Sequence, residues 1–273
     1  MMRRKVSRLD GVLLDMDGVL FHGDRPLPHA IPFLREISSF PYLLVTNNPS
    51  RTPQEVARRM RKMGFEEISP AHILTSAEAS AEWLARQKPA FRYFAVGAAG
   101  LHAALSAQGV ADSEAADYVV VGEGPGLDYD ALTTGINLIL KQGAALVATN
   151  PDETVDAVRD GEHIVLPGGG ALVAPFVVAT GVDPVVIGKP QPVLYEMALE
   201  KVGCRADACL MIGDRPDTDI AGAARLGMMT ALVRTGRFLP GEKIPERLPR
   251  PTWDVDDLKA LREVLATHFQ TPS

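Results

Sequence analysis

The chain has 273 residues, and its 28 Lys and Arg against 34 Asp and Glu give a formal net charge of −6. This acidic balance disfavours nucleic acid and anionic lipid as main partners, and no segment reaches the ~18 apolar residues that a membrane span requires. Hydrophobic residues make up 46% and charged residues 23%, which excludes a wholly disordered or collagen-like chain.

The predicted elements begin after a basic stretch, residues 1–8. That start resembles the n-region of a signal peptide, but Asp15 and Asp17 break the apolar run behind it, so a solvated chain end is favoured. Short apolar runs then alternate with amphipathic stretches, which is typical of strand–helix units and a mostly parallel sheet. Strands are predicted at residues 11–15, 42–46, 92–96, 118–121, 144–149, 184–187, 208–212 and 230–233.

The helices between these strands carry end signals. Thr52 and Glu55 form a capping box with Pro53 at the first helical position, and the segment from Thr75 to Glu78 offers a second capping box. Further helices are predicted over residues 192–202 and 218–226, each followed by a glycine that stops it.

The spacing of the polar strand ends predicts the domain organisation. The chain between Asn48 and Lys189 is long enough for an inserted unit of about a hundred residues. We predict a doubly wound α/β core with a parallel sheet, residues 1–78 and 182–273, and an α/β unit inserted at 79–181. Two crossings would join core and insert, which is a usual way to build a lid.

Two aspartates follow the first apolar run. Asp15 and Asp17 would lie at the carboxyl end of a buried strand, where ligands bind in open α/β sheets. Two carboxylates this close repel each other, so either one is protonated or a cation lies between them. Oxygen-only ligands suit Mg²⁺. Two solvated turn aspartates remain the alternative.

Two further strand ends carry groups suited to an anion. Thr46, Asn47 and Asn48 offer a hydroxyl and backbone N–H groups that can hold a phosphate, although an Asn-rich turn is the simpler interpretation. Lys189 follows another apolar run and could place a fixed positive charge near a phosphoryl group. On its own, it is as well explained as a solvated lysine.

A fourth strand end is acidic. Asp214 follows residues 208–212, and Asp219 lies five residues further on. Acids near a helix start can simply be caps. Together with Asp15 and Asp17, however, they form the kind of cluster that a divalent metal needs.

These four motifs, in this order, resemble those of the haloacid dehalogenase superfamily. The stretches from Thr46 to Thr52, Ala148 to Asp152 and Gly188 to Pro190 look like its class IIA, NagD-like branch, which includes p-nitrophenyl phosphatases and phosphoglycolate phosphatases. That branch carries a large α/β cap between its second and third motifs. The position and size of the predicted insert agree with such a cap, which would supply substrate specificity.

The resemblance implies a role for each matched residue. Asp15 would be the nucleophile and Asp17 the general acid and base, and Asp15, the Asp17 carbonyl and Asp214 would hold Mg²⁺. Asp219 would not bind the metal itself but would orient a metal-bound water or Lys189. The phosphoryl oxygens would be bound by Thr46, the Asn47 N–H and Lys189. Asn48, His22 and Gly169 are candidate substrate contacts, with a surface turn favoured for His22.

The function predicted in this way is a Mg²⁺-dependent phosphatase that hydrolyses phosphomonoesters of small metabolites through an aspartyl-phosphate. A phosphomutase, a dehalogenase and a phosphate-binding regulator with an idle site are the alternatives. The two cysteines, Cys204 and Cys209, are too few for a disulfide framework, so a reducing, cytoplasmic location is expected. The expected partner is a small phosphorylated metabolite, with no nucleic acid and no membrane, and a homodimer through the cap is left open.

Overall fold

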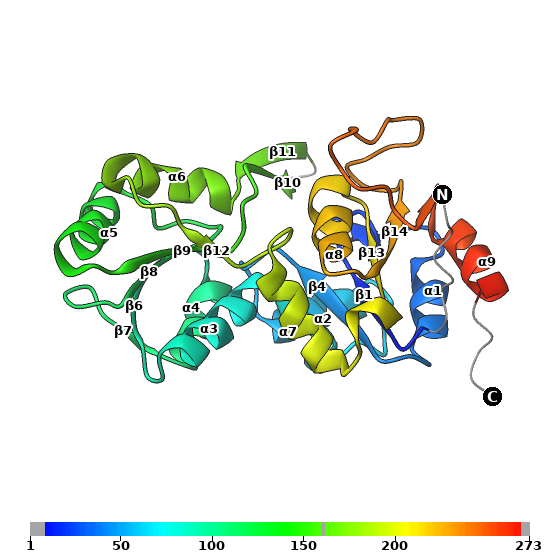
Figure 1. The fold of residues 1–273 in the computed structure, drawn as a ribbon, viewed down its shortest axis with the longest axis horizontal. Coiled ribbons are helices and arrows are strands. Elements are labelled where there is room, and N and C mark those ends of the chain that lie inside the picture. Colours follow the sequence, from blue (N-terminus) through cyan, green and yellow to red (C-terminus); the bar gives the residue numbers. More distant parts are fainter. Residues whose placement is uncertain (1–8, 160–161, 269–273) are drawn as a thin grey trace. The chain divides into compact units, whose positions relative to one another are not determined.

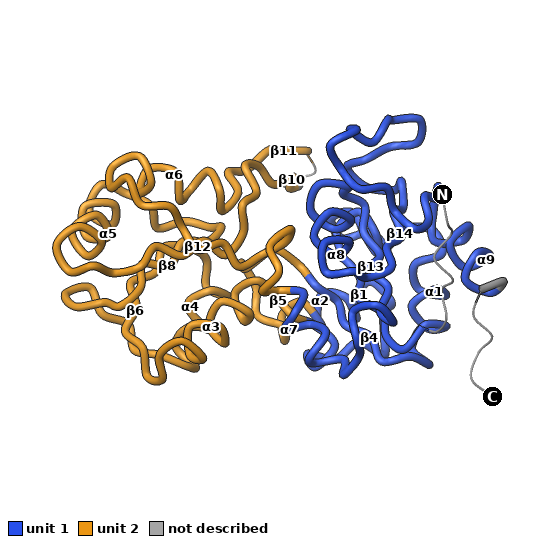
Figure 2. Tube along the Cα trace, in the orientation of Figure 1, with its two compact units in different colours: residues 1–45, 57–73, 195–273 blue, residues 46–56, 74–194 orange. Residues whose placement is uncertain are grey.

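The computed structural model describes residues 9–159 and 162–268; the basic start lies outside them. The chain divides into two compact units, drawn blue and orange in Figure 2. Unit 1 comprises Met1–Val45, Ala57–Ile73 and Tyr195–Ser273, and unit 2 comprises Thr46–Val56 and Leu74–Leu194. The predicted insert, 79–181, lies inside unit 2, which extends beyond it on both sides. A catalytic role for one unit and a specificity role for the other remain predictions.

A six-stranded sheet lies in unit 1, apart from the strand-end residues Thr46, Leu74 and Thr75, which belong to unit 2. In sheet order the strands are β15 (Trp253–Val255), β14 (Met229–Val233), β13 (Cys209–Gly213), β1 (Gly11–Leu14), β4 (Tyr42–Thr46) and β5 (Ile73–Thr75). The pairs from β15 to β4 are parallel. The chain builds the sheet outward on both sides of β1, so β1 and β13 flank the point where the strand order reverses. Ligands bind beside such a point in doubly wound folds, at the carboxyl ends of the strands.

The remaining elements of unit 1 are short connections and helices (Figure 1). The hairpin β2 (Phe21–His22) and β3 (Arg25–Pro26) follows β1. The helices are α1 (Ala30–Ile37), α8 (Ala221–Arg225) and α9 (Leu258–His268), and a π-helical turn covers Pro216–Ile220. Two more helices, α2 (Pro53–Lys62) and α7 (Pro192–Val202), run through positions where the chain passes from one unit to the other.

Unit 2 has its own five-stranded parallel sheet. In sheet order its strands are β12 (Val185–Val186), β9 (Ala145–Ala148), β8 (Tyr118–Val121), β6 (Arg92–Val96) and β7 (Val110–Ala111). The helices are α3 (Ser76–Gln87), α4 (Ala99–Ser106), α5 (Tyr129–Gln142) and α6 (Gly169–Thr180). An antiparallel hairpin, β10 (Thr154–Arg159) and β11 (Glu162–Pro167), leads into α6.

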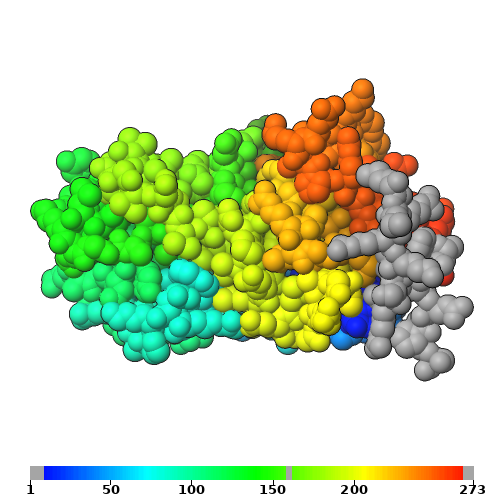
Figure 3. Space-filling model, viewed as in Figure 1, coloured from blue at the N-terminus to red at the C-terminus, as the bar shows by residue number. Residues whose placement is uncertain are grey.

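The core of unit 2 forms where α5 and α6 cover its sheet. Val119 and Val121 of β8 pack with Leu138 of α5 and with Phe176 of α6, and each of these side chains is buried. Gly135 of α5 lies against the Phe176 ring, where a Cβ would collide with it. Figure 3 shows the outer surface of this region in green, formed by the segment that contains α5 and α6.

The predicted α/β class with parallel sheets is confirmed, and a strand lies at each of the eight predicted places. The capping box at α2 is also confirmed, because Glu55 N–H donates to Thr52 Oγ1 (3.3 Å) and Thr52 N–H donates to Glu55 Oε2 (2.9 Å). At α3, Glu78 N–H donates to Thr75 Oγ1 (3.2 Å), so Thr75 is the N-cap residue and one of the two bonds of the predicted second capping box is formed. Helix α7 has its predicted bounds.

One predicted helix, residues 218–226, is wrong in form. The segment begins earlier, as a π-helical turn, and only its second half is the short helix α8. The Arg215 carbonyl accepts from both Asp219 N–H (3.0 Å) and Ile220 N–H (3.2 Å), and this second bond widens the turn. No helix in the described part of the chain is long and apolar enough to cross a membrane.

Candidate active site

Three carboxylates gather at the carboxyl ends of β1 and β13. Asp15 follows β1, Asp214 follows β13, and Asp219 comes from the π-helical turn. One oxygen of each residue lies within 4.8 Å of the others. Asp214 is 3% exposed and Asp219 is 1% exposed, whereas Asp15 is partly accessible to solvent. The structure therefore brings Asp15, Asp214 and Asp219 together within unit 1.

Small residues make room for the Asp214 side chain. Its Oδ2 accepts a hydrogen bond from Arg237 N–H (2.7 Å). A Cβ on Gly18 would lie 2.5 Å from the same Oδ2, and a Cβ on Gly236 would overlap the carboxylate. Gly18 also has a φ of +80°, which side chains of L-residues rarely adopt. Two glycines far apart in the sequence thus allow two backbone segments to pass close to one acid.

Asp219 is held by its own turn. Its Oδ2 accepts from Arg215 N–H (3.1 Å), and Gly213 approaches the carboxylate so closely that a Cβ there would overlap it. The Tyr195 hydroxyl of α7 donates to the carbonyls of Thr218 (2.9 Å) and Asp219 (3.1 Å). These bonds fix the backbone that carries Asp219.

Tyr195 is a residue that the sequence reasoning missed. Its side chain is fully buried, and burial together with the negative charges of Asp219 and Asp15 raises its pKa well above the ordinary value. It therefore remains a neutral hydroxyl, which donates to the backbone carbonyls of Thr218 and Asp219. The available signal was a tyrosine on the apolar face of a predicted helix, because a buried phenol usually has a hydrogen-bond partner.

The three carboxylates suit a divalent cation. Carboxylates at this spacing, two of them buried, repel one another, and a cation relieves that repulsion. All three offer oxygen ligands only, which is the donor type that Mg²⁺ prefers. Asp15 and Asp214 are two of the predicted metal ligands, and Asp219 is close enough to contribute directly or to bind a metal-bound water.

Asp17 lies in the loop that follows β1. Its side chain is exposed, and a bridge pairs it with Phe21 at the start of the next hairpin. Next to this loop, His22 Nε2 of β2 donates to the Thr235 carbonyl (2.8 Å), and Thr235 Oγ1 donates to the Gly18 carbonyl (2.6 Å). From its exposed position in β2, His22 thus braces the segment whose Arg237 N–H donates to Asp214, and substrate contact by His22 stays a prediction.

The predicted phosphate-binding residues lie together in unit 2. The Asn47 side chain bonds to the Lys189 backbone in both directions: Asn47 Nδ2 donates to Lys189 O (3.0 Å), and Lys189 N–H donates to Asn47 Oδ1 (2.7 Å). Thr46 Oγ1 accepts from Asn48 N–H (3.1 Å), which leaves the hydroxyl proton for donation to an anion. Lys189 is 2% exposed, so it is not a solvated surface lysine.

The two remaining candidates have structural contacts. Asn48 Oδ1 accepts from Ser50 N–H (2.9 Å) and forms a turn that leads towards α2. Gly169 is buried at the first position of α6, where a Cβ would lie 2.8 Å from the Asn150 Oδ1. Substrate contact by either residue remains a prediction.

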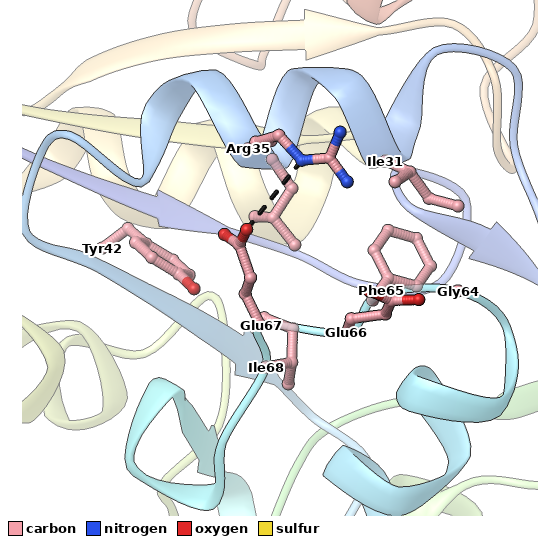
Figure 4. A pocket seen from close by; sticks show the side chains of 9 residues that line it. Ile31, Arg35, Tyr42, Gly64, Phe65, Glu66, Glu67 and Ile68 are labelled. Atoms are coloured by element: carbon pink, nitrogen blue, oxygen red, sulfur yellow. Dashed lines mark ion pairs between the residues drawn. The ribbon is translucent and has the colours of Figure 1, made fainter.

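A shallow surface hollow lies elsewhere in unit 1 (Figure 4). It sits at Tyr42, the first residue of β4, whereas the predicted site residue Thr46 is the last. Arg35 and Glu67 form a long ion pair of 3.9 Å beside it. Its lining is completed by Ile31, Leu34, Gly64, Phe65, Glu66 and Ile68. Because it lies at the amino end of the strand, this hollow is separate from the carboxylate cluster.

Comparison with known proteins identifies the family. A haloacid dehalogenase-like hydrolase model matches residues 12–111, and a second model of that kind, HAD-hydrolase-like, matches residues 186–261. The chain is 36% identical over 255 residues to a dihydroxyacetone phosphatase of Corynebacterium glutamicum, with 92% of this chain and 90% of the relative covered. It is also 36% identical over 251 residues to an acid sugar phosphatase of Staphylococcus saprophyticus, covering 90% and 94%.

Solved structures show the same relationship. A p-nitrophenyl phosphatase from Archaeoglobus fulgidus matches with a TM-score of 0.86 and 30% identity over 95% of this chain and 100% of that one. NagD from Escherichia coli K-12 matches with a TM-score of 0.82 and 30% identity, covering 92% and 98%. The chain belongs to the haloacid dehalogenase superfamily, in its class IIA, NagD-like branch. It is an enzyme of the phosphatase type, a phosphoric monoester hydrolase.

Proposed function

We propose that this chain is a Mg²⁺-dependent phosphatase that hydrolyses phosphomonoesters of small metabolites through an aspartyl-phosphate on Asp15. The observation that carries the proposal is the cluster of Asp15, Asp214 and Asp219, whose carboxylate oxygens lie within 4.8 Å of one another. Asp15 is the member of this cluster that solvent reaches, so it is suited to attack a substrate. Bound Mg²⁺ would neutralise charge on the transferring phosphoryl group and on the nucleophile.

The proposed reaction has two displacements. In the first, a carboxylate oxygen of Asp15 attacks phosphorus, the bond to the ester oxygen breaks, and Asp17 gives its proton to the leaving alkoxide. In the second, Asp17 takes a proton from water, the water oxygen attacks phosphorus, and Asp15 leaves as a carboxylate. The exposed position of Asp17 is compatible with proton exchange with solvent between the two steps.

Thr46, Asn47 and Lys189 are proposed to bind the phosphoryl oxygens of the same substrate. The transferring group spreads its charge over three equatorial oxygens, so positioned donors and a fixed ammonium supply much of the catalysis. The two-way contact between Asn47 and the Lys189 backbone supports a shared role for these residues. A location in the cytoplasm and a homodimer through the cap remain proposals that rest on the sequence.

The substrate class is proposed from chemistry and relatives. Relatives with about a third of their residues identical are named dihydroxyacetone phosphatase and acid sugar phosphatase. We therefore propose phosphate esters of small polyhydroxylated metabolites as substrates. A phosphate-release screen over triose, pentose and hexose phosphates, phosphoglycolate, nucleoside monophosphates and pyridoxal phosphate would identify the preferred ester.

The first test is hydrolysis of p-nitrophenyl phosphate with Mg²⁺, with EDTA, and by the variant Asp15→Asn. Wild-type protein should release p-nitrophenol only with the metal, and Asp15→Asn should lose at least about a thousandfold in kcat because no nucleophile remains. Binding of inorganic phosphate should survive in that variant. Acid quench of wild-type enzyme with ³²P-labelled substrate should trap label on the peptide that contains Asp15.

Each alternative has its own outcome. Full activity in EDTA would exclude the metal, and full activity in Asp15→Asn would exclude the aspartyl-phosphate. Release of halide from a 2-haloacid without p-nitrophenol release would indicate a dehalogenase. Transfer of labelled phosphate to a second position of a sugar phosphate, rather than to water, would indicate a phosphomutase. Phosphate binding without turnover would indicate a regulator.

A further inference from the structure

Asn47, which is half-buried, is the centre of a largely buried hydrogen-bond network within unit 2. The side-chain amide of Asn47 both donates to and accepts from the Lys189 backbone, as the backbone of a neighbouring strand would. It thereby joins two segments that are 142 positions apart in the sequence. Asn47 Nδ2 also donates to Asp152 Oδ2 (2.9 Å). The side chain is thus committed to holding Lys189, and Asn47 can contribute to anion binding only through its backbone.

The Asn47 backbone is held in turn by Asn150. Asn150 Nδ2 donates to the Asn47 carbonyl (2.8 Å) and to Glu123 Oε1 (2.9 Å), and Asn150 Oδ1 accepts from Asp152 N–H (3.0 Å). The Ser76 hydroxyl donates to the same Asn47 carbonyl (2.5 Å). Two donors thus hold this carbonyl, and with it the orientation of the peptide that links Asn47 to Asn48.

The space around the network is closed to larger side chains. A Cβ on Gly188 would lie 2.7 Å from Asn47 Oδ1 and 3.0 Å from the Asn150 Cβ. A Cβ on Gly169 would lie 2.8 Å from Asn150 Oδ1. Asn150 is 0% exposed, so it reaches neither solvent nor substrate directly. Any influence of Asn150 on the reaction must pass through the groups that it holds.

We propose that Asn150 is a positioning residue for phosphoryl transfer, which fixes the Asn47 backbone and, through the Asn47 side chain, the start of the Lys189 segment. This inference rests on the proposed function, because it assigns the work of Asn150 to the residues that bind the phosphoryl group. A satisfied buried polar network holds its members in one geometry, and displacement of catalytic groups by about 1 Å can cost on the order of a hundredfold in rate.

The first experiment compares Asn150→Ala with Asn137→Ala. Asn137 lies on α5 in the same unit, and its Nδ2 donates to the Thr133 carbonyl (2.8 Å) on an exposed face. Both variants therefore remove an asparagine that bonds to a main-chain carbonyl. With p-nitrophenyl phosphate, Asn150→Ala should lower kcat by at least about tenfold with a smaller change in KM. Asn137→Ala should match the wild type.

A double-mutant cycle then separates positioning from folding. If Asn150 acts through Lys189, the loss of kcat caused by Asn150→Ala should shrink to within about twofold when Lys189 is already alanine. A merely structural asparagine would lower kcat by the same factor in both backgrounds. Ser76→Ala, which removes the second donor to the Asn47 carbonyl, is the milder variant should Asn150→Ala fail to fold. It should show a smaller loss with the same dependence on Lys189.

The affinity for inorganic phosphate, measured by calorimetry in the presence of Mg²⁺, gives a readout without turnover. We expect Asn150→Ala, or Ser76→Ala in its place, to weaken phosphate binding severalfold, and expect no weakening in Asn137→Ala. Wild-type phosphate binding without p-nitrophenol release would overturn the proposed function but leave this readout valid. Unchanged kcat and phosphate affinity in Asn150→Ala, or equal losses in both backgrounds of the cycle, would overturn the positioning role.

Discussion

At the scale of single residues, the carboxylate cluster depends on neighbouring glycines, because they have no side chain that would displace a carboxylate. Gly18 and Gly227 have nearly the same φ, +80° and +81°. Only Gly18 faces a neighbour, since its Cβ would lie 2.5 Å from Asp214 Oδ2, whereas a Cβ on Gly227 would meet nothing within 4 Å. The two glycines therefore separate the cost of backbone strain from the effect of displacing a proposed metal ligand.

We expect Gly227→Ala to lose on the order of 1 kcal/mol of stability, because it forces a Cβ into the left-handed region. Gly18→Ala should lose more, because its Cβ would also lie 2.8 Å from the Gly236 Cα and 2.5 Å from Asp214 Oδ2. Only Gly18→Ala should also weaken Mg²⁺ binding, by at least about tenfold, since Asp214 must move. Calorimetric titration with Mg²⁺, beside thermal unfolding in EDTA, measures both effects. Equal Mg²⁺ affinities in the two variants would remove Asp214 from the metal site.

At the scale of elements, Asp117 ties three parts of unit 2 together. It precedes β8, accepts from Arg92 N–H (2.8 Å) at the start of β6, and pairs with Lys88 Nζ (2.6 Å) at the end of α3. Burial by itself would raise the pKa of Asp117, but the hydrogen bonds from Arg92 and Lys88 and their positive charges lower it below its ordinary value. The carboxylate form is therefore preferred more strongly in the folded chain than in the unfolded one.

The stability that Asp117 contributes should be present above about pH 4 and should disappear as the pH falls through its lowered pKa. Asp117→Asn should thus be less stable than wild type at pH 7, by no more than about 1 kcal/mol for a partly solvated pair. The difference should shrink steadily as the pH is lowered below about 4 and the carboxylate is protonated. Urea unfolding at a series of pH values measures it, and a difference that is constant with pH would show that the charge is irrelevant.

At the scale of the whole molecule, the residues proposed to bind the metal and those proposed to bind phosphate are each organised within one unit. Asp15, Asp214 and Asp219 belong to unit 1, and Thr46, Asn47 and Lys189 belong to unit 2. Each group is organised by contacts inside its own unit: the π-helical turn and Tyr195 in the first, and the network around Asn47 in the second. Binding of Mg²⁺ and binding of phosphate should therefore each slow hydrogen exchange in a different set of residues.

Hydrogen exchange can detect that separation. Mg²⁺ alone should slow exchange near residues 15–18, 213–219 and 235–237, because it orders the carboxylates and the loops that support them. Addition of inorganic phosphate should extend protection to residues 46–48 and 188–191. Protection of the second set by Mg²⁺ alone, without phosphate, would contradict the division of roles.

Several elements and site residues were predictable from sequence for a local reason. Strands such as β8 and β13 are continuous apolar runs, and the capping box at Thr52 is complete within four residues. The hairpin of β10 and β11 was missed although β11 contains the apolar run Ile164-Val165-Leu166 and the sequence between the strands, Asp160-Gly161, is a common hairpin signal. The residues of β11 are exposed or half-buried, so it is not one of the fully buried strands that such runs usually mark. Local pattern identifies an element when burial or capping leaves a mark within a few residues.

The sequence by itself determined the α/β class, the family resemblance, and the polar residues that end the strands, because each of these is encoded over a short stretch. Only the tertiary structure decided which residues meet. Asp219 joins Asp15 and Asp214, Tyr195 donates beneath them, and Asn150 holds Asn47 across 103 positions. Contacts of this range depend on strand order and on close approaches allowed by glycines, and neither leaves a local pattern in one sequence.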